Sequence, residues 1–202
     1  MAGSRPGPAP AAVTLGRTLL LALLAWFTLR QFADADYRGI WAGLNLVLHE
    51  AGHLALGWFG SAWLSAIGGT AFHLACIGAV GVAFWRQQDR FAVAVTVWWA
   101  GTVFVEAAPY IADARVQNLP LVTVGDGPVS HDWFVILDGL GLLARDQQLG
   151  GLARASGLAL LVAGLVGGAS IAARAARSDG DVDGVPTPVP RTENRRRPPT
   201  SG

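Results

Sequence analysis

Long apolar runs dominate this sequence and restrict its fold more than any other feature. Roughly 20 consecutive apolar residues form a helix that can cross a 30 Å hydrocarbon core. Charged residues make up 14% of the chain, compared with about 25% in ordinary soluble domains. We therefore expect an all-α fold, a polytopic transmembrane helical bundle. The clear apolar runs cover residues 14–32, 40–59, 62–85, 91–112 and 152–173.

A sixth segment, residues 131–144, makes the expected number of spans five or six. It is shorter than the ~20 apolar residues that a span needs, so it either re-enters the membrane or crosses it as a tilted, protein-covered helix. The first run also resembles a secretory signal peptide, since small residues follow it at positions 33–35. Trp26 and Arg30 fit a cleavage site poorly and favour a retained span.

The two ends of the chain differ in composition from its apolar middle. Residues 1–13 are rich in Pro, Ala and Gly, and we expect a flexible N-terminus there. Residues 14–174 form the expected transmembrane helical domain, in which the polar residues 145–151 connect two helices. Residues 175–202 are rich in Pro and Arg, a composition typical of a disordered tail.

Charge and codon usage restrict the partners and the location. The net charge is +1, so nothing in the composition favours binding to nucleic acid, and the lipid bilayer is the expected surrounding. All 15 basic residues are arginine, in a chain rich in Ala, Gly and Val, as is typical of GC-rich bacterial genomes. We expect a multi-pass protein of a bacterial cell membrane.

The second run contains an HExxH motif, His49-Glu50-Ala51-Gly52-His53. On a helix, residues four apart share a face, so both imidazoles can bind one Zn²⁺. Glu50 can then act as the catalytic base that takes a proton from a water molecule at the metal. The motif is expected near mid-bilayer depth, where ionisable side chains are functional by default.

Two further ionisable residues lie inside apolar runs. His73 is expected at a depth similar to that of His49, where it could bind metal, position substrate or pack as a hydrogen-bonded core residue. Glu106 precedes Pro109, which kinks or ends a helix. It is either a partner of the histidines in the metal site or a residue near the water interface. Both are possible substrate-positioning residues.

With these motifs, residues 40–145 resemble the site-2 protease family of intramembrane zinc metallopeptidases. The resemblance implies that His49 and His53 are zinc ligands and that Glu50 is the general base. It also implies a glycine-rich motif with a downstream asparagine on the next helix. Gly68-Gly69 followed by His73 resembles that motif, with histidine in place of the asparagine. The family's third ligand is an aspartate in a later motif, of which this chain has no clean copy.

Zinc with one open position requires a third protein ligand, and several residues are candidates. Asp132 follows the N-cap candidate Ser130, so the helix dipole would stabilise its carboxylate, and we favour it. Its neighbour His131 is an alternative. Asp138, in Leu137-Asp138-Gly139, looks most like the family's aspartate motif, and Asp113 follows Pro109 in the family's order.

The expected function is a membrane-embedded zinc metalloprotease that hydrolyses peptide bonds of membrane or membrane-adjacent polypeptide substrates. One alternative is a haem-binding membrane protein that uses His49 or His53 together with His73. Another is a non-catalytic binding module built on the same scaffold.

Overall fold

The chain is all-α in the computed structural model, which describes residues 10–34, 37, 39–121 and 131–183. This confirms the expected fold class, and no strand occurs among these residues. Residues 1–9 and 184–202, and with them most of the expected N-terminal segment and tail, lie outside the described part. The helices are α1 (Pro10–Ala33), α2 (Trp41–Gly57), α3 (Ala62–Arg86), α4 (Arg90–Ala112), α5 (Asp132–Gly139), the 3-10 helix η1 (Leu143–Arg145) and α6 (Asp146–Asp183).

Four of the described helices are long and apolar enough to cross a membrane. They are α1, α3, α4 and α6, so five or six spans is more than the structure supports. Helix α5 has eight residues and is too short for a crossing. Helix α2 has 17 residues and begins deep in the bundle, where the ring centroid of Trp41 lies 5.6 Å from that of Trp98 in α4.

Two helices extend beyond the boundaries expected from the sequence. Helix α1 begins at Pro10 rather than after residue 13, and α6 runs from Asp146 to Asp183. The polar residues 145–151 are therefore mostly the first turns of α6, and residues 175–183 are helical rather than part of a disordered tail. Contacts with the end of α4 explain the early start, because Gln147 donates a hydrogen bond to the carbonyl of Ala112 at 2.6 Å.

Helices α4 and α6 pack antiparallel through a glycine repeat. Gly150, Gly157 and Gly164 of α6 lie seven residues apart, and a Cβ on any of them would lie 2.7–2.8 Å from a carbonyl oxygen of α4. The matching carbonyls also repeat every seven residues: they belong to Ala108, Gly101 and Ala94. Equal repeats on both helices keep the register constant, as in coiled coils and in membrane helices with small residues at the interface.

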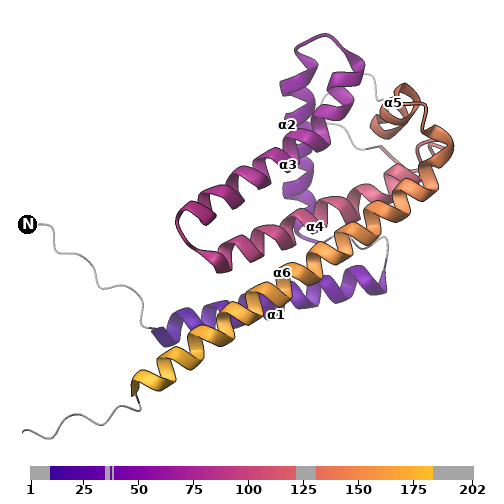
Figure 1. Ribbon diagram of the computed structural model, residues 1–202. Helices are drawn as coiled ribbons and strands as arrows, with labels where there is room; N and C mark the ends of the chain where they lie inside the picture. The colour runs from indigo at the N-terminus through magenta and orange to yellow at the C-terminus, as the bar shows by residue number, and fades with distance from the viewer. Residues whose placement is uncertain (1–9, 35–36, 38, 122–130, 184–202) are drawn as a thin grey trace, which may run out of the picture.

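Helix α1 lies beside α6 and completes the core (Figure 1). Its Leu24 and Phe27 are buried in one cluster with Trp98 of α4. The indole N–H of Trp98 donates to the hydroxyl of Thr28 at 2.8 Å. The first apolar run thus packs as part of the bundle.

A second glycine contact joins α2 to α3. A Cβ on Gly52 would lie 2.2 Å from the carbonyl oxygen of Gly68, and one on Gly68 would lie 2.6 Å from that of Gly52. The two helices run antiparallel from the tight turn at Gly60, whose φ of 69° suits glycine. This contact places the HExxH face of α2 directly on the start of α3.

We predict that Gly157→Ala destabilises the bundle. The new methyl group would meet the carbonyl of Gly101 and the side chain of Val105, and overpacking of this kind costs about 1–3 kcal/mol. Gly151→Ala is the matched control on the same helix, because no atom lies within 4 Å of its added Cβ. Thermal unfolding in detergent should show a lower Tm for Gly157→Ala alone; equal Tm values would contradict the close packing.

Candidate metal centre

The HExxH motif and the start of α5 meet at one point. The Oδ2 atom of Asp132 lies 3.1 Å from Nε2 of His49 and 3.0 Å from Nε2 of His53. Asp132 is in the first turn of α5, and α5 packs against α3, where a Cβ on Gly139 would meet the Trp63 ring at 2.8 Å. The structure therefore brings together both motif histidines and the third-ligand candidate favoured from sequence.

The hydrogen bonds at His53 suit a cation between these groups. Its Nδ1–H can donate to the carbonyl of Ser65 at 2.8 Å, which leaves the lone pair of Nε2 facing the Asp132 carboxylate. Two acceptors at this distance repel unless a proton or a metal ion lies between them. A histidine whose second nitrogen bonds a backbone carbonyl is also the usual form of a metal ligand.

The distances also fit the size of zinc. Four ligands at about 2.0–2.1 Å from Zn²⁺ in a tetrahedron lie about 3.3 Å from one another. The two separations between Asp132 Oδ2 and the histidine Nε2 atoms, 3.0 and 3.1 Å, are close to that edge length. His49, Glu50 and His53 could hold a metal ion, since one ligand atom from each lies within 4.8 Å of the others.

Glycine 69 of α3 forms the floor of the site. A Cβ at this position would lie 2.5–2.8 Å from ring atoms of His49, so any larger residue would push the imidazole away. The three candidate ligands are partly exposed at the surface. The exposed fractions of the His49, His53 and Asp132 side chains are 26%, 21% and 21%.

Burial and hydrogen bonding act in opposite directions on Asp132. Burial raises the pKa of its carboxyl group, whereas hydrogen bonding with His49 and His53, when they are protonated, lowers it, and together they leave the pKa below its usual value. Asp132 is therefore ionised at neutral pH, the state that metal binding requires.

The motif lies near one end of the bundle. His49 faces Gly69 and His53 faces Ser65, both in the first turns of α3. The motif therefore lies beside the first turns of α3 and not beside its middle, because α2 pairs with the start of α3. His73, one turn deeper on α3 than Gly69, occupies the more central position.

The other third-ligand candidates lie apart from the histidine pair. The Nδ1 atom of His131 caps α5 by accepting from the N–H of Phe134 at 3.3 Å, and its Nε2 lies 3.6 Å from Asp113. Asp113 accepts from the backbone N–H groups of Asn118 and Leu119 and so closes the turn after α4. Asp138 is exposed at the far end of α5.

Asn45 links His73 and Glu106, the two possible substrate-positioning residues. Its amide nitrogen donates to Glu106 Oε2 at 2.8 Å and to the Thr102 hydroxyl at 3.0 Å. Its oxygen lies 3.2 Å from Nε2 of His73 and accepts from the indole N–H of Trp99 at 2.9 Å. Sequence reasoning missed Asn45, although it precedes His49 by four residues and interrupts an apolar run.

We predict that Asn45→Leu destabilises the protein by several kcal/mol. It would leave polar groups of His73, Trp99 and Glu106 without their Asn45 partner, and each unsatisfied buried group costs about 1–3 kcal/mol. Thr96→Val is the control, because that buried hydroxyl bonds only the Ala92 carbonyl of its own helix. Chemical unfolding in detergent measures both, and similar losses for the two variants would argue against the network.

Comparison with known proteins supplies no assignment. No family model, curated protein or solved structure matches this chain. Any function must therefore be inferred from the geometry of the residues themselves.

Proposed function

We propose that this protein is a membrane-embedded zinc metallopeptidase. The observation that carries the proposal is that Asp132 Oδ2 lies 3.0–3.1 Å from Nε2 of both His49 and His53, while Glu50 lies within 4.8 Å of the two histidines. Two imidazoles and one carboxylate are a common catalytic zinc set, which leaves a fourth position open. The resemblance of residues 40–145 to the site-2 protease family supports the same proposal.

Each residue then has a distinct role. His49, His53 and Asp132 would hold the zinc, which when bound polarises a carbonyl and makes a water molecule acidic. Glu50 takes a proton from the attacking water and passes it to the departing amine. The Ser65 carbonyl fixes the orientation of His53, and Gly69 allows the His49 ring to reach the same point.

The network around Asn45 supports roles for His73 and Glu106 behind the ligands. Trp99 can only donate, so the Asn45 oxygen is the atom that accepts, and His73 must present an N–H on Nε2. His73 is therefore held in one tautomer and one orientation. We assign His73 and Glu106 to positioning rather than to metal binding.

The haem alternative is less well supported. A porphyrin needs open space on both sides of an axial histidine, but the backbone of Gly69 lies against the His49 ring. Nε2 of His73 is already bonded to Asn45, and His49 and His53 share one carboxylate. A non-catalytic binding module differs from a peptidase in one testable way. Its function would not change when Glu50 is substituted.

We predict that Glu50→Gln keeps zinc and abolishes proteolysis, because the amide cannot accept the proton. Zinc is measured by elemental analysis of purified protein, and cleavage with a panel of transmembrane peptides in proteoliposomes. His49→Ala is the comparison variant and should lose zinc. Undiminished turnover by Glu50→Gln would exclude the hydrolase mechanism.

We predict that Asp132→Ala lowers zinc occupancy as strongly as His53→Ala does. Asp138→Ala is the matched control, an aspartate on the same short helix that is exposed and distant from the histidines. It should retain full zinc. Loss of zinc from Asp138→Ala but not from Asp132→Ala would assign the third ligand to the other aspartate.

A further inference from the structure

Three parts of the chain meet at one end of the bundle: the start of α1, the α3–α4 turn and the end of α6 (Figure 1). The guanidinium carbon of Arg17 lies 5.1 Å from the centre of the Phe91 ring, which joins α1 to the start of α4. A Cβ on Gly168 of α6 would contact both Leu21 and Phe91. The four candidate spans therefore alternate in direction, with the start of α1 and the end of α6 on the same side.

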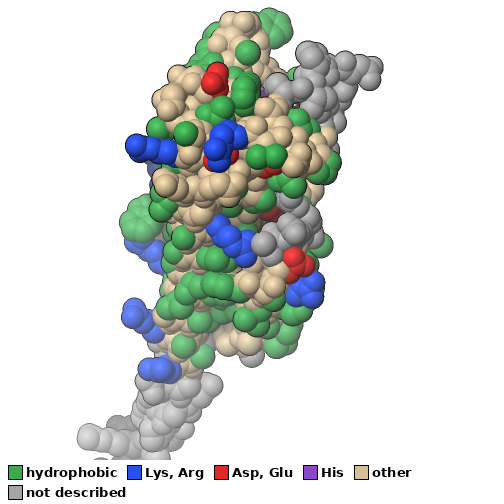
Figure 2. Space-filling model, turned by 90° about the vertical axis from the view of Figure 1, so that its right-hand side faces the viewer, with side chains coloured by type: hydrophobic (Ala, Val, Ile, Leu, Met, Phe, Trp, Pro, Cys, Tyr) green, Lys and Arg blue, Asp and Glu red, His purple; other side chains and the backbone are tan. Residues whose placement is uncertain are grey.

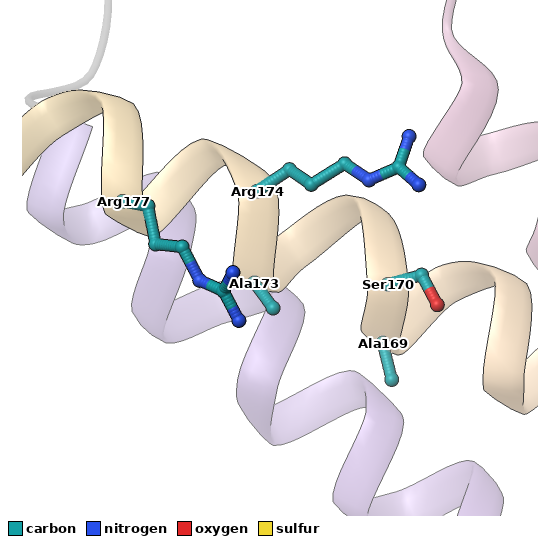
Figure 3. A pocket seen from close by; sticks show the side chains of 5 residues that line it. All are labelled: Ala169, Ser170, Ala173, Arg174 and Arg177. Carbon is teal, nitrogen blue, oxygen red and sulfur yellow. The ribbon is translucent and has the colours of Figure 1, made fainter.

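Arginine is somewhat more frequent at this end, and it is frequent in the sequence that follows α6. The described arginines there are Arg17, Arg86, Arg90, Arg174 and Arg177. Arg174 and Arg177 line a shallow open pocket on α6, next to α1 (Figure 3). In the sequence, four more arginines follow α6, namely Arg191 and residues 195–197, which lie outside the described residues.

The described arginines of the opposite end number four, compared with five at the first end: Arg30, Arg115, Arg145 and Arg154. Arg145 is exposed, and the other three have partners within the protein. Arg115 pairs with Asp146 at 2.8 Å, Arg154 donates to the carbonyl of Gln31 at 2.9 Å, and the guanidinium of Arg30 stacks on Tyr37. Figure 2 shows arginine side chains distributed along one face of the molecule, among hydrophobic ones. Arginines near span ends are retained on the cytoplasmic side, so the bias identifies that side.

Helix α3 relates the candidate metal centre to these two sides. Trp63 and Trp85 lie near its two ends and are partly exposed, as in the aromatic belts of membrane proteins. Their 22-residue separation is about 33 Å along the axis, close to a bilayer thickness. Ser65 and Gly69 lie only about 3 and 9 Å from Trp63 along that axis, far from the arginine-rich end.

We infer that the arginine-rich end is cytoplasmic and that the candidate metal centre opens at the opposite, extracytoplasmic interface. The orientation stands on the arginines and on α3 alone. The orientation also identifies the substrate class, and this second step rests on the proposed function. The substrates are polypeptide segments at the outer membrane–water boundary, such as the extracytoplasmic ends of membrane-spanning helices.

Cysteine labelling tests the orientation without any need for zinc or activity. In a Cys76→Ala background, Asp138→Cys places an exposed thiol at the same end of the bundle as the metal centre, and Gln87→Cys places one in the α3–α4 turn. A membrane-impermeant maleimide should label Asp138→Cys in intact bacterial cells, and Gln87→Cys only after permeabilisation. The reverse pattern, or labelling of both in intact cells, would overturn the inference.

A cleavage assay separates this inference from the proposed function. A single-span reporter with a different tag on each side is expressed with the wild type or with Glu50→Gln. Cleavage by the wild type alone, close to the extracytoplasmic tag, is the expected result. Cleavage close to the cytoplasmic tag would overturn the inference and leave the protease proposal intact. No cleavage, with the labelling as expected, would refute the substrate assignment and the protease proposal but not the orientation.

Discussion

Close backbone packing through glycine is the constraint on which the rest of this structure depends. In a hydrocarbon surrounding, helices gain little from burying apolar surface, so they associate through van der Waals contact and hydrogen bonds. Gly150, Gly157 and Gly164 let the first half of α6 lie directly on the carbonyls of α4. This pair gives α1 a surface to pack on and fixes where Trp98 and Thr102 meet α2.

The same device creates the candidate metal centre. The contact of Gly52 with Gly68 brings α2 so near to α3 that the Ser65 carbonyl reaches His53 and Gly69 supports His49. Without that approach the two imidazoles would face lipid or other side chains. The glycines that hold the bundle together and those that shape the site thus act by one mechanism, the absence of a Cβ at a helix contact.

Buried polar groups then fix the orientation of what the glycines bring close. Asn45 accepts from Trp99 and donates to Glu106, so its own direction is set, and through it that of His73. Unpaired polar groups are costly inside a membrane bundle, so such a network selects one register of α2 against α3 and α4. Asp132 completes the set from α5, the shortest α-helix in the described part of the chain.

Composition and spacing were sufficient for the helical membrane fold, for the HExxH residues on one helical face and for Asp132 as a ligand candidate at a helix start. These features depend on local periodicity, which a sequence displays directly. Three features could not be predicted from the sequence: the position of the motif beside the start of α3, the length of α2 and the length of α6. Each depends on which helix packs against which. Asn45 and the meeting of Asp132 with the histidines were decided by tertiary structure, since residues 83 positions apart become neighbours only when the chain folds.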